Sequence, residues 1–155
     1  MTRWWQMVLG LGLLGAVEAA VAGPVTQVRL LKIEAVTFEI RHRVFAGFRE
    51  QNRVKLKEDF QVGDTPYSAR VVEFVPDFAM DLKSRKVISR SNEPKNPAFR
   101  IIVREKGVPQ DTTWAFLNMP PHFARNSMLA FQVLRIDFAD RPPIVSGDST
   151  KASQP

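Results

Sequence analysis

The chain has 155 residues, with 22 Lys and Arg against 16 Asp and Glu and a formal net charge of +6. This length suits a single domain. The sequence contains no cysteine, which excludes disulfides, iron–sulfur clusters, thiolate zinc sites, a cysteine nucleophile and covalent attachment of haem to cysteine. Its two histidines are His42 and His122, so a site built from several imidazoles is also excluded.

Residues 1–22 have the pattern of a secretory signal peptide. Arg3 supplies the positive start, an apolar run follows at 7–17, and small residues suited to cleavage lie at 20–22. The apolar run is shorter than the roughly 20 residues that span a bilayer. We therefore expect the leader to be removed on export to a Gram-negative periplasm, and its retention as an N-terminal anchor is the alternative.

The mature chain is dominated by short apolar or alternating segments, the pattern of half-buried strands. Val36, Phe38 and Ile40, for example, alternate with Thr37 and Glu39. Strands are expected at 28–40, 54–57, 67–75, 86–89, 98–104, 112–117 and 128–138, with Gly, Pro and Asp turns between them. The pattern predicts an all-β fold: a single antiparallel β-sandwich of about seven to eight short strands over residues 23–139.

Two stretches depart from this strand pattern. Residues 41–53 show no clear period and leave two alternatives, a helical turn or the end of a long hairpin. Residues 140–155 are rich in Pro, Ser, Thr and Asp and have few large apolar side chains, so we expect a disordered tail.

A run of basic residues lies early in the mature chain: Arg41, His42, Arg43, Arg49, Arg53, Lys55 and Lys57. Such a run would suit anionic lipid headgroups, phosphate or the acidic surface of a partner. The simpler interpretation is the solvated face of a basic protein. The run lacks the interleaved aromatic residues on which single-stranded nucleic acids stack, so no nucleic-acid role is expected.

Soft ligands for haem iron or copper occur late in the chain. Met119 and His122 lie three residues apart and Met128 follows six residues later. Thioether and imidazole groups suit Cu(I) and haem iron, although methionine is also a common gap-filler in cores. These three residues define the alternative hypothesis, a carrier of a small ligand, whereas the leading interpretation has no cofactor and no metal site.

Signals for catalysis are missing from the sequence. The serines at 89 and 91 have no glycine-flanked elbow, and the eight glycines form no phosphate-binding loop. The paired aspartates at 77 and 81 carry no sign of the environments that separate the pKa values of an acid and a base. We therefore expect a non-enzymatic protein.

The most unusual residues cluster in the segments 74–78, 89–98 and 114–116. One interpretation is architectural, because Asp and Asn beside Pro form turns and Trp114 alternates with Ala115 as a core residue would. The functional interpretation is a contact surface for a protein partner made by Phe78, Arg90, Asn96 and Trp114, since aromatic residues and Arg are enriched at binding hot spots.

The same stretch resembles the exported β-domain of ResB-like cytochrome c biogenesis proteins. The motifs that carry the resemblance lie within about residues 58–138: FQVGD (60–64), VVEFVPDF (71–78), SRS (89–91), PKNPA (94–98), WAF (114–116) and PHF (121–123). The family implies a β-domain outside the cytoplasmic membrane, within an assembly that delivers haem to apocytochromes. Members of that family carry several transmembrane helices, whereas no segment after this leader is apolar enough to span a membrane.

Together these observations predict an exported accessory domain that binds an envelope protein, with acidic character, at the outer face of the membrane. Its positive charge would also favour peripheral contact with an anionic bilayer. Cytochrome c maturation is the process that the resemblance implies.

Overall fold

The computed structural model describes residues 31–147, and within that range the chain forms ten β-strands and no helix. The expected signal peptide and the last eight residues of the expected tail lie outside the described residues. The strands are β1 (Ile33–His42), β2 (Arg49–Val54), β3 (Asp59–Gln61), β4 (Tyr67–Val75), β5 (Phe78–Met80), β6 (Val87–Ser89), β7 (Ala98–Glu105), β8 (Val108–Phe116), β9 (Leu129–Phe138) and β10 (Ile144–Val145).

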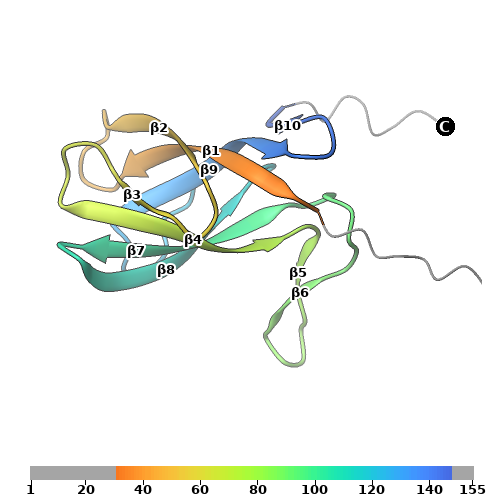
Figure 1. Cartoon of the computed structure of the whole chain (residues 1–155). Helices are drawn as coiled ribbons and strands as arrows, with labels where there is room; N and C mark the ends of the chain where they lie inside the picture. The colour runs from red at the N-terminus through yellow and green to blue at the C-terminus, as the bar shows by residue number, and fades with distance from the viewer. Residues whose placement is uncertain (1–30, 148–155) are drawn as a thin grey trace, which may run out of the picture.

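Two four-stranded antiparallel sheets face each other and form a sandwich, which confirms the predicted fold class (Figure 1). One sheet has the order β10-β9-β1-β2 and the other β3-β4-β7-β8. Strands β5 and β6 form a separate two-stranded hairpin that stands away from the sandwich (Figure 1). The sandwich itself has eight strands, within the predicted seven to eight, and the hairpin adds two that were not expected as a separate sheet.

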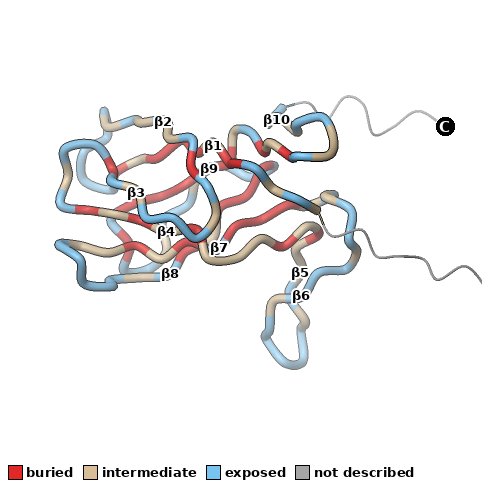
Figure 2. Tube along the Cα trace, in the orientation of Figure 1, coloured by how far each residue is buried: buried red, intermediate tan, exposed pale blue. Residues whose placement is uncertain are grey.

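The core lies between the two sheets and is built by the alternation seen in the sequence. Buried residues concentrate on β1, β4, β7, β8 and β9 (Figure 2). At the centre, Phe38 of β1 meets Phe99 of the facing sheet edge-to-face, with ring centroids 5.9 Å apart, and Phe131 of β9 at 6.0 Å. Burial of such side chains contributes on the order of 2 kcal/mol each, and it fixes which face of each strand points inward.

The segment 41–53 is the end of a long hairpin, and the expectation of a helical turn there is wrong. Strand β2 pairs with β1 from Arg41↔Arg49 to Val36↔Val54. The strand expected at 54–57 is also wrong beyond Val54, because residues 55–58 form a turn in which Lys57 has a positive φ of 67°. Strand β2 lies at a sheet edge and buries only Val54, so no apolar period marks it.

Two further expectations are corrected by the structure. Trp114 is only partly buried, because the strand alternation turns its neighbours Thr113 and Ala115 inward. The tail was predicted to be disordered from residue 140, yet Ile144 and Val145 pair with β9 as an edge strand. Ile144 packs against the core, and a single apolar pair among prolines gives too short a pattern to recognise.

Candidate functional site

The four residues proposed from the sequence as a contact surface lie together at the base of the β5–β6 hairpin. They are Phe78, Arg90, Asn96 and Trp114. Phe78 begins β5, and its ring lies 5.1 Å from that of Trp114 and 4.9 Å from that of Phe116 on β8. Asn96 joins the same place, because its carbonyl accepts the Phe78 amide and its side-chain amide donates to the Phe78 carbonyl. Arg90 follows β6 and reaches back to the residue before Phe78.

Asp77 is the centre of the polar network at this base. Its side chain is 5% exposed; one carboxylate oxygen accepts a 2.6 Å hydrogen bond from Arg90 Nη2, and the other accepts a 3.2 Å bond from Ser91 Oγ. The Asp77 carbonyl also accepts the Arg90 amide, and its own amide donates to Ser89 Oγ at 3.2 Å. A buried carboxylate is tolerated only when it is paired in this way.

Asn96 also holds the base of the hairpin in place. Its side-chain amide donates to the Phe78 carbonyl at 3.0 Å, and its carbonyl accepts the Phe78 amide at 2.9 Å. Residues 77 and 96 form an isolated parallel bridge. Asn96 and the carboxylate of Asp77 are thus occupied in holding the hairpin, while the Arg90 side chain remains 59% exposed.

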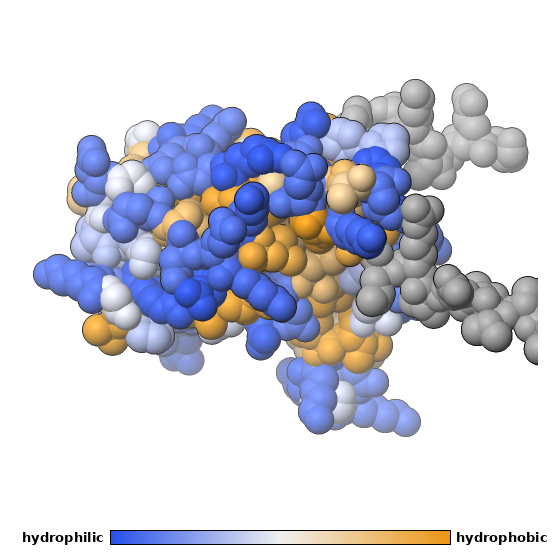
Figure 3. All heavy atoms as spheres, in the orientation of Figure 1, coloured by the Kyte–Doolittle hydropathy of each residue, from blue (hydrophilic) through white to orange (hydrophobic). Residues whose placement is uncertain are grey.

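Beyond its base the hairpin exposes apolar side chains that the sequence analysis did not single out. Leu82 at the turn is 88% exposed, and Met80 and Ile88 are also exposed. Apolar surface gathers where the hairpin leaves the sandwich, and the tip beyond it is hydrophilic (Figure 3). The tip holds Lys83, Arg85 and Lys86 against one acid, Asp81. The signal that would have found this surface is a short basic run at 83–86 with apolar residues on both sides, at 80 and 82 and at 87 and 88.

The turn of the hairpin is locally organised. One carboxylate oxygen of Asp81 accepts the amides of Lys83 and Ser84 at 2.9 and 2.7 Å, and these bonds with Ser84 and Lys83 hold the pKa of Asp81 below its ordinary value. The Arg85 amide donates to the Asp81 carbonyl at 2.9 Å, and Arg85 adopts a positive φ of 56°. Leu82 is therefore presented on an ordered turn.

The candidate haem or copper ligands are not brought together as a set. His122 stacks near Phe116 at the end of β8, with ring centroids 5.7 Å apart. Met128 instead lines a pocket with Asp111, near the start of β8. A strand rises about 3.3 Å per residue, so the five residues from Asp111 to Phe116 place His122 and Met128 toward opposite ends of the strand. Met119 lies exposed in the loop before His122.

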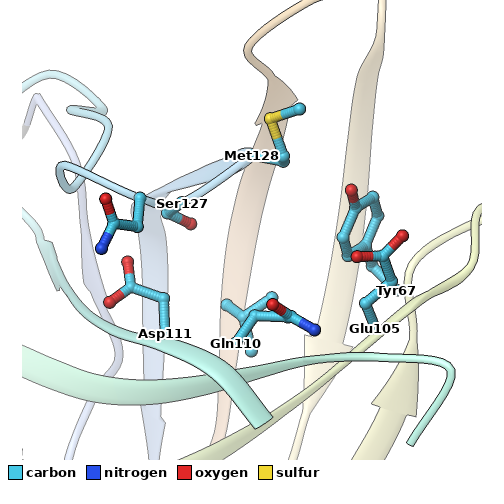
Figure 4. Close-up of a pocket in the computed structure, with 8 residues that line it drawn as sticks. Tyr67, Glu105, Gln110, Asp111, Ser127 and Met128 are labelled. Atoms are coloured by element: carbon cyan, nitrogen blue, oxygen red, sulfur yellow. The ribbon is translucent and has the colours of Figure 1, made fainter. Parts of the chain in front are cut away.

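The pocket beside Met128 is small and is lined by both polar and apolar groups (Figure 4). Its cavity volume is about 40 Å³, far below the usual 300–1,000 Å³ of small-molecule sites. Tyr67 and Glu105 lie on one side and Asp111 on the other (Figure 4). Burial, with a smaller effect of the Glu105 charge, raises the pKa of Tyr67. One Asp111 oxygen is buried without a hydrogen-bond partner.

Two features are absent from the described range, a cluster of metal ligands and a membrane-spanning helix. No three His, Asp or Glu side chains converge there as ligands of an ion. Across residues 31–147 no helix has the length and apolar character needed to cross a bilayer.

The basic run of the sequence divides into separate roles. Arg41 forms an ion pair with Glu39 at 2.7 Å, and Arg53 bonds Asp137 at 3.0 Å. His42 is buried rather than part of a charged surface, and its ring packs against Phe45, Phe48 and Tyr67. The run is therefore not one continuous cationic face.

Comparison of the chain with protein-family models, with curated proteins and with solved structures found no match in any of the three.

Proposed function

We propose that this chain is an exported, non-enzymatic accessory domain that binds an acidic protein partner through the β5–β6 hairpin, at the outer face of the membrane. The observation that carries the proposal is an ordered, projecting hairpin that exposes Met80, Leu82 and Ile88. The register pairs Met80 with Val87 and Ile88 with Ala79, so Met80 and Ile88 lie on opposite faces of the hairpin. Exposed apolar groups rimmed by polar residues are typical of interaction sites. The support from the leader and from the ResB-like motifs is sequence resemblance alone.

The charge of the hairpin favours an acidic partner. Lys83, Arg85, Lys86 and Arg90 follow one another around the turn and β6, and the nearby carboxylates of Asp77 and Asp81 already accept hydrogen bonds. A cationic rim steers an acidic protein toward the apolar centre and makes association sensitive to salt.

The two-stranded form of the hairpin favours a protein over a lipid surface. Strands β5 and β6 form a separate two-stranded sheet in the described range. Asn96 bonds the backbone groups of Phe78 on the β5 side, which leaves outward backbone groups along the β6 edge. A partner strand satisfies such groups by adding to the edge, whereas hydrocarbon leaves each unpaired at a cost of several kcal/mol. The polar residues at the base hold the hairpin in shape through hydrogen bonds, and a surface of fixed shape suits contact with a protein.

The proposal is tested by placing a photoreactive amino acid at Leu82 in the exporting cell. We expect one discrete crosslinked protein with an acidic surface, lost when Lys83, Arg85 and Lys86 are changed to Gln together. The matched control is the same photoreactive residue at Gln51, an exposed position on β2, where no such product is expected. No crosslink at 82, or the same products at 82 and 51, would overturn the partner assignment.

A second measurement tests cytochrome c maturation separately. In cells whose only copy of the chain carries Leu82→Asp, the covalently bound haem of c-type cytochromes should fall while the amount of the chain is unchanged. Normal covalent haem with loss of the Leu82 crosslink would reject the role in maturation and keep the binding role.

A further inference from the structure

A second exposed apolar surface lies on the loops that join β1 to β2 and lead into β9. It consists of Val44, Phe45, Phe123 and Met128, here called the loop platform. Val44 and Phe45 are 63% and 64% exposed, and Phe123 and Met128 are also exposed. It is built from the loop ends of the sandwich rather than from the hairpin used in the proposed function.

Arg43 joins the two loops that form the platform. Its side chain donates to the carbonyls of Ser127 at 2.9 Å and Ala124 at 2.6 Å, and its guanidinium lies 5.2 Å from the centre of the Phe123 ring. Its amide donates to the Met128 carbonyl at 2.8 Å. The platform is therefore assembled before any partner arrives, which lowers the ordering cost of binding.

The backbone of the exposed tip is already hydrogen bonded from within. The buried His42 ring accepts the amides of Val44 and Phe45 through Nδ1, at 3.1 and 3.3 Å. The Phe48 amide donates to the Phe45 carbonyl at 2.9 Å. Unsatisfied backbone groups are the main cost of placing a loop in lipid. The amides of Val44 and Phe45 are already hydrogen bonded, so they would not add this cost when the two side chains enter the lipid.

Exposed arginines lie on or directly beside both loops of the platform, with Arg43 and Arg49 flanking Val44 and Phe45 in the chain. Arg43, Arg49 and Arg125 are all exposed, and Glu39, the acid beside Arg49, also pairs with Arg41 at 2.7 Å. Glu105 and Asp111 lie in the pocket on the Met128 side. The approach through Val44 and Phe45 is thus the cationic one, and it complements anionic headgroups.

From these features we infer that the loop platform contacts an anionic lipid bilayer, with Val44 and Phe45 entering the interface and the arginines meeting phosphate. Apolar side chains on a projecting tip suit the interface between headgroups and acyl chains. The contact is peripheral, and it holds the sandwich against a membrane while the β5–β6 hairpin remains available to a protein.

The absence of cysteine from the chain permits a direct test on the full-length protein. An environment-sensitive fluorophore is attached to Val44→Cys and, as the control, to Leu82→Cys on the hairpin. Both are mixed with vesicles of phosphatidylcholine alone or of phosphatidylcholine and phosphatidylglycerol in equal parts. We expect a blue shift at 44 only with phosphatidylglycerol and none at 82. No shift at 44, equal shifts at both positions, or a shift without phosphatidylglycerol would overturn the inference.

Unlabelled variants separate the apolar contribution from the charge. Phe45→Ser should weaken affinity for the anionic vesicles by about tenfold, and Arg49→Gln with Arg125→Gln by at least about tenfold. The matched control is Lys83→Gln with Arg85→Gln, which removes the same charge from the hairpin and should leave affinity within about twofold. An equal loss of affinity in that control would show that the chain adheres to the vesicles through its net charge alone. It would reject the loop platform as the site of contact. Because the hairpin crosslink and vesicle binding use different residues, either proposal can fail alone.

Discussion

At the scale of single residues, Asp77 is the group on which the β5–β6 hairpin depends most. Its buried carboxylate accepts bonds from Arg90 and Ser91. Asp77→Ala should lower the free energy of unfolding by about 1–3 kcal/mol, because Ser91 loses a partner and the charged bond to Arg90 disappears. Urea unfolding measures the change, and amide exchange at Phe78 should accelerate.

The control for Asp77 is Asp64→Ala, which changes an exposed aspartate in the turn before β4. Its effect should stay within about 0.5 kcal/mol. Equal losses in the two variants would mean that the carboxylate of Asp77 does not brace the hairpin.

His42 and Trp114 show where residue-scale prediction from the sequence reaches its limit. The neighbours Arg41 and Arg43 made His42 look like part of a charged surface, yet it is a buried acceptor for two amides. Trp114 looked like core, yet it faces outward and the Phe78 ring covers part of it. Both roles depend on contacts between distant segments, which no local pattern encodes. The clustering of Phe78, Arg90, Asn96 and Trp114 was anticipated as a group because turn residues concentrate there.

At the scale of elements, the β7–β8 hairpin depends on the backbone conformation of its turn. Lys106 and Gly107 have φ values of 49° and 82°, the conformation of the tight turns that suit strand twist. A Cβ at Gly107 would meet nothing within 4 Å. Gly107→Ala should therefore cost about 1 kcal/mol through backbone strain alone. Thermal and urea unfolding would both record it.

Gly47→Ala is the matched comparison for Gly107→Ala, because a Cβ there also meets open space and the residue has no positive φ. Its stability should be unchanged or slightly raised, since alanine restricts the unfolded chain. If Gly47→Ala were as destabilising as Gly107→Ala, strain at the turn would not be the cause.

The strands that were predicted and those that were missed differ in position within the sheets. Segments such as 67–75 and 98–104 alternate because one face meets the core, so their period is visible. β2, β3 and β10 lie at sheet edges. β2 and β3 carry mostly polar residues, and β10 is a single apolar pair. Their pairing is decided by the neighbouring strand and the turn, which explains why local periodicity did not reveal them.

At the scale of the whole molecule, ion pairs on the outer faces of both sheets predict loss of stability in acid. Bonds from Arg135 and Arg53, at 2.6 and 3.0 Å, hold the pKa of Asp137 below its ordinary value against the opposing effect of burial. On the other sheet, Arg70 with Arg104 lowers the pKa of Asp59. A carboxyl whose folded pKa is depressed stabilises the fold above its unfolded pKa of about 4 and loses that contribution as pH falls through the folded value. We expect the urea midpoint to decline below about pH 4.

Asp137→Asn provides the decisive comparison for this acid sensitivity, since Asp137 is only 13% exposed and joins β9 to Arg53 of β2. The variant should be less stable than the wild type at neutral pH and should lose less stability between neutral and acid pH, because the titrating group is gone. Asp64→Asn should follow the wild-type profile. Parallel pH profiles for Asp137→Asn and wild type would place the acid sensitivity elsewhere.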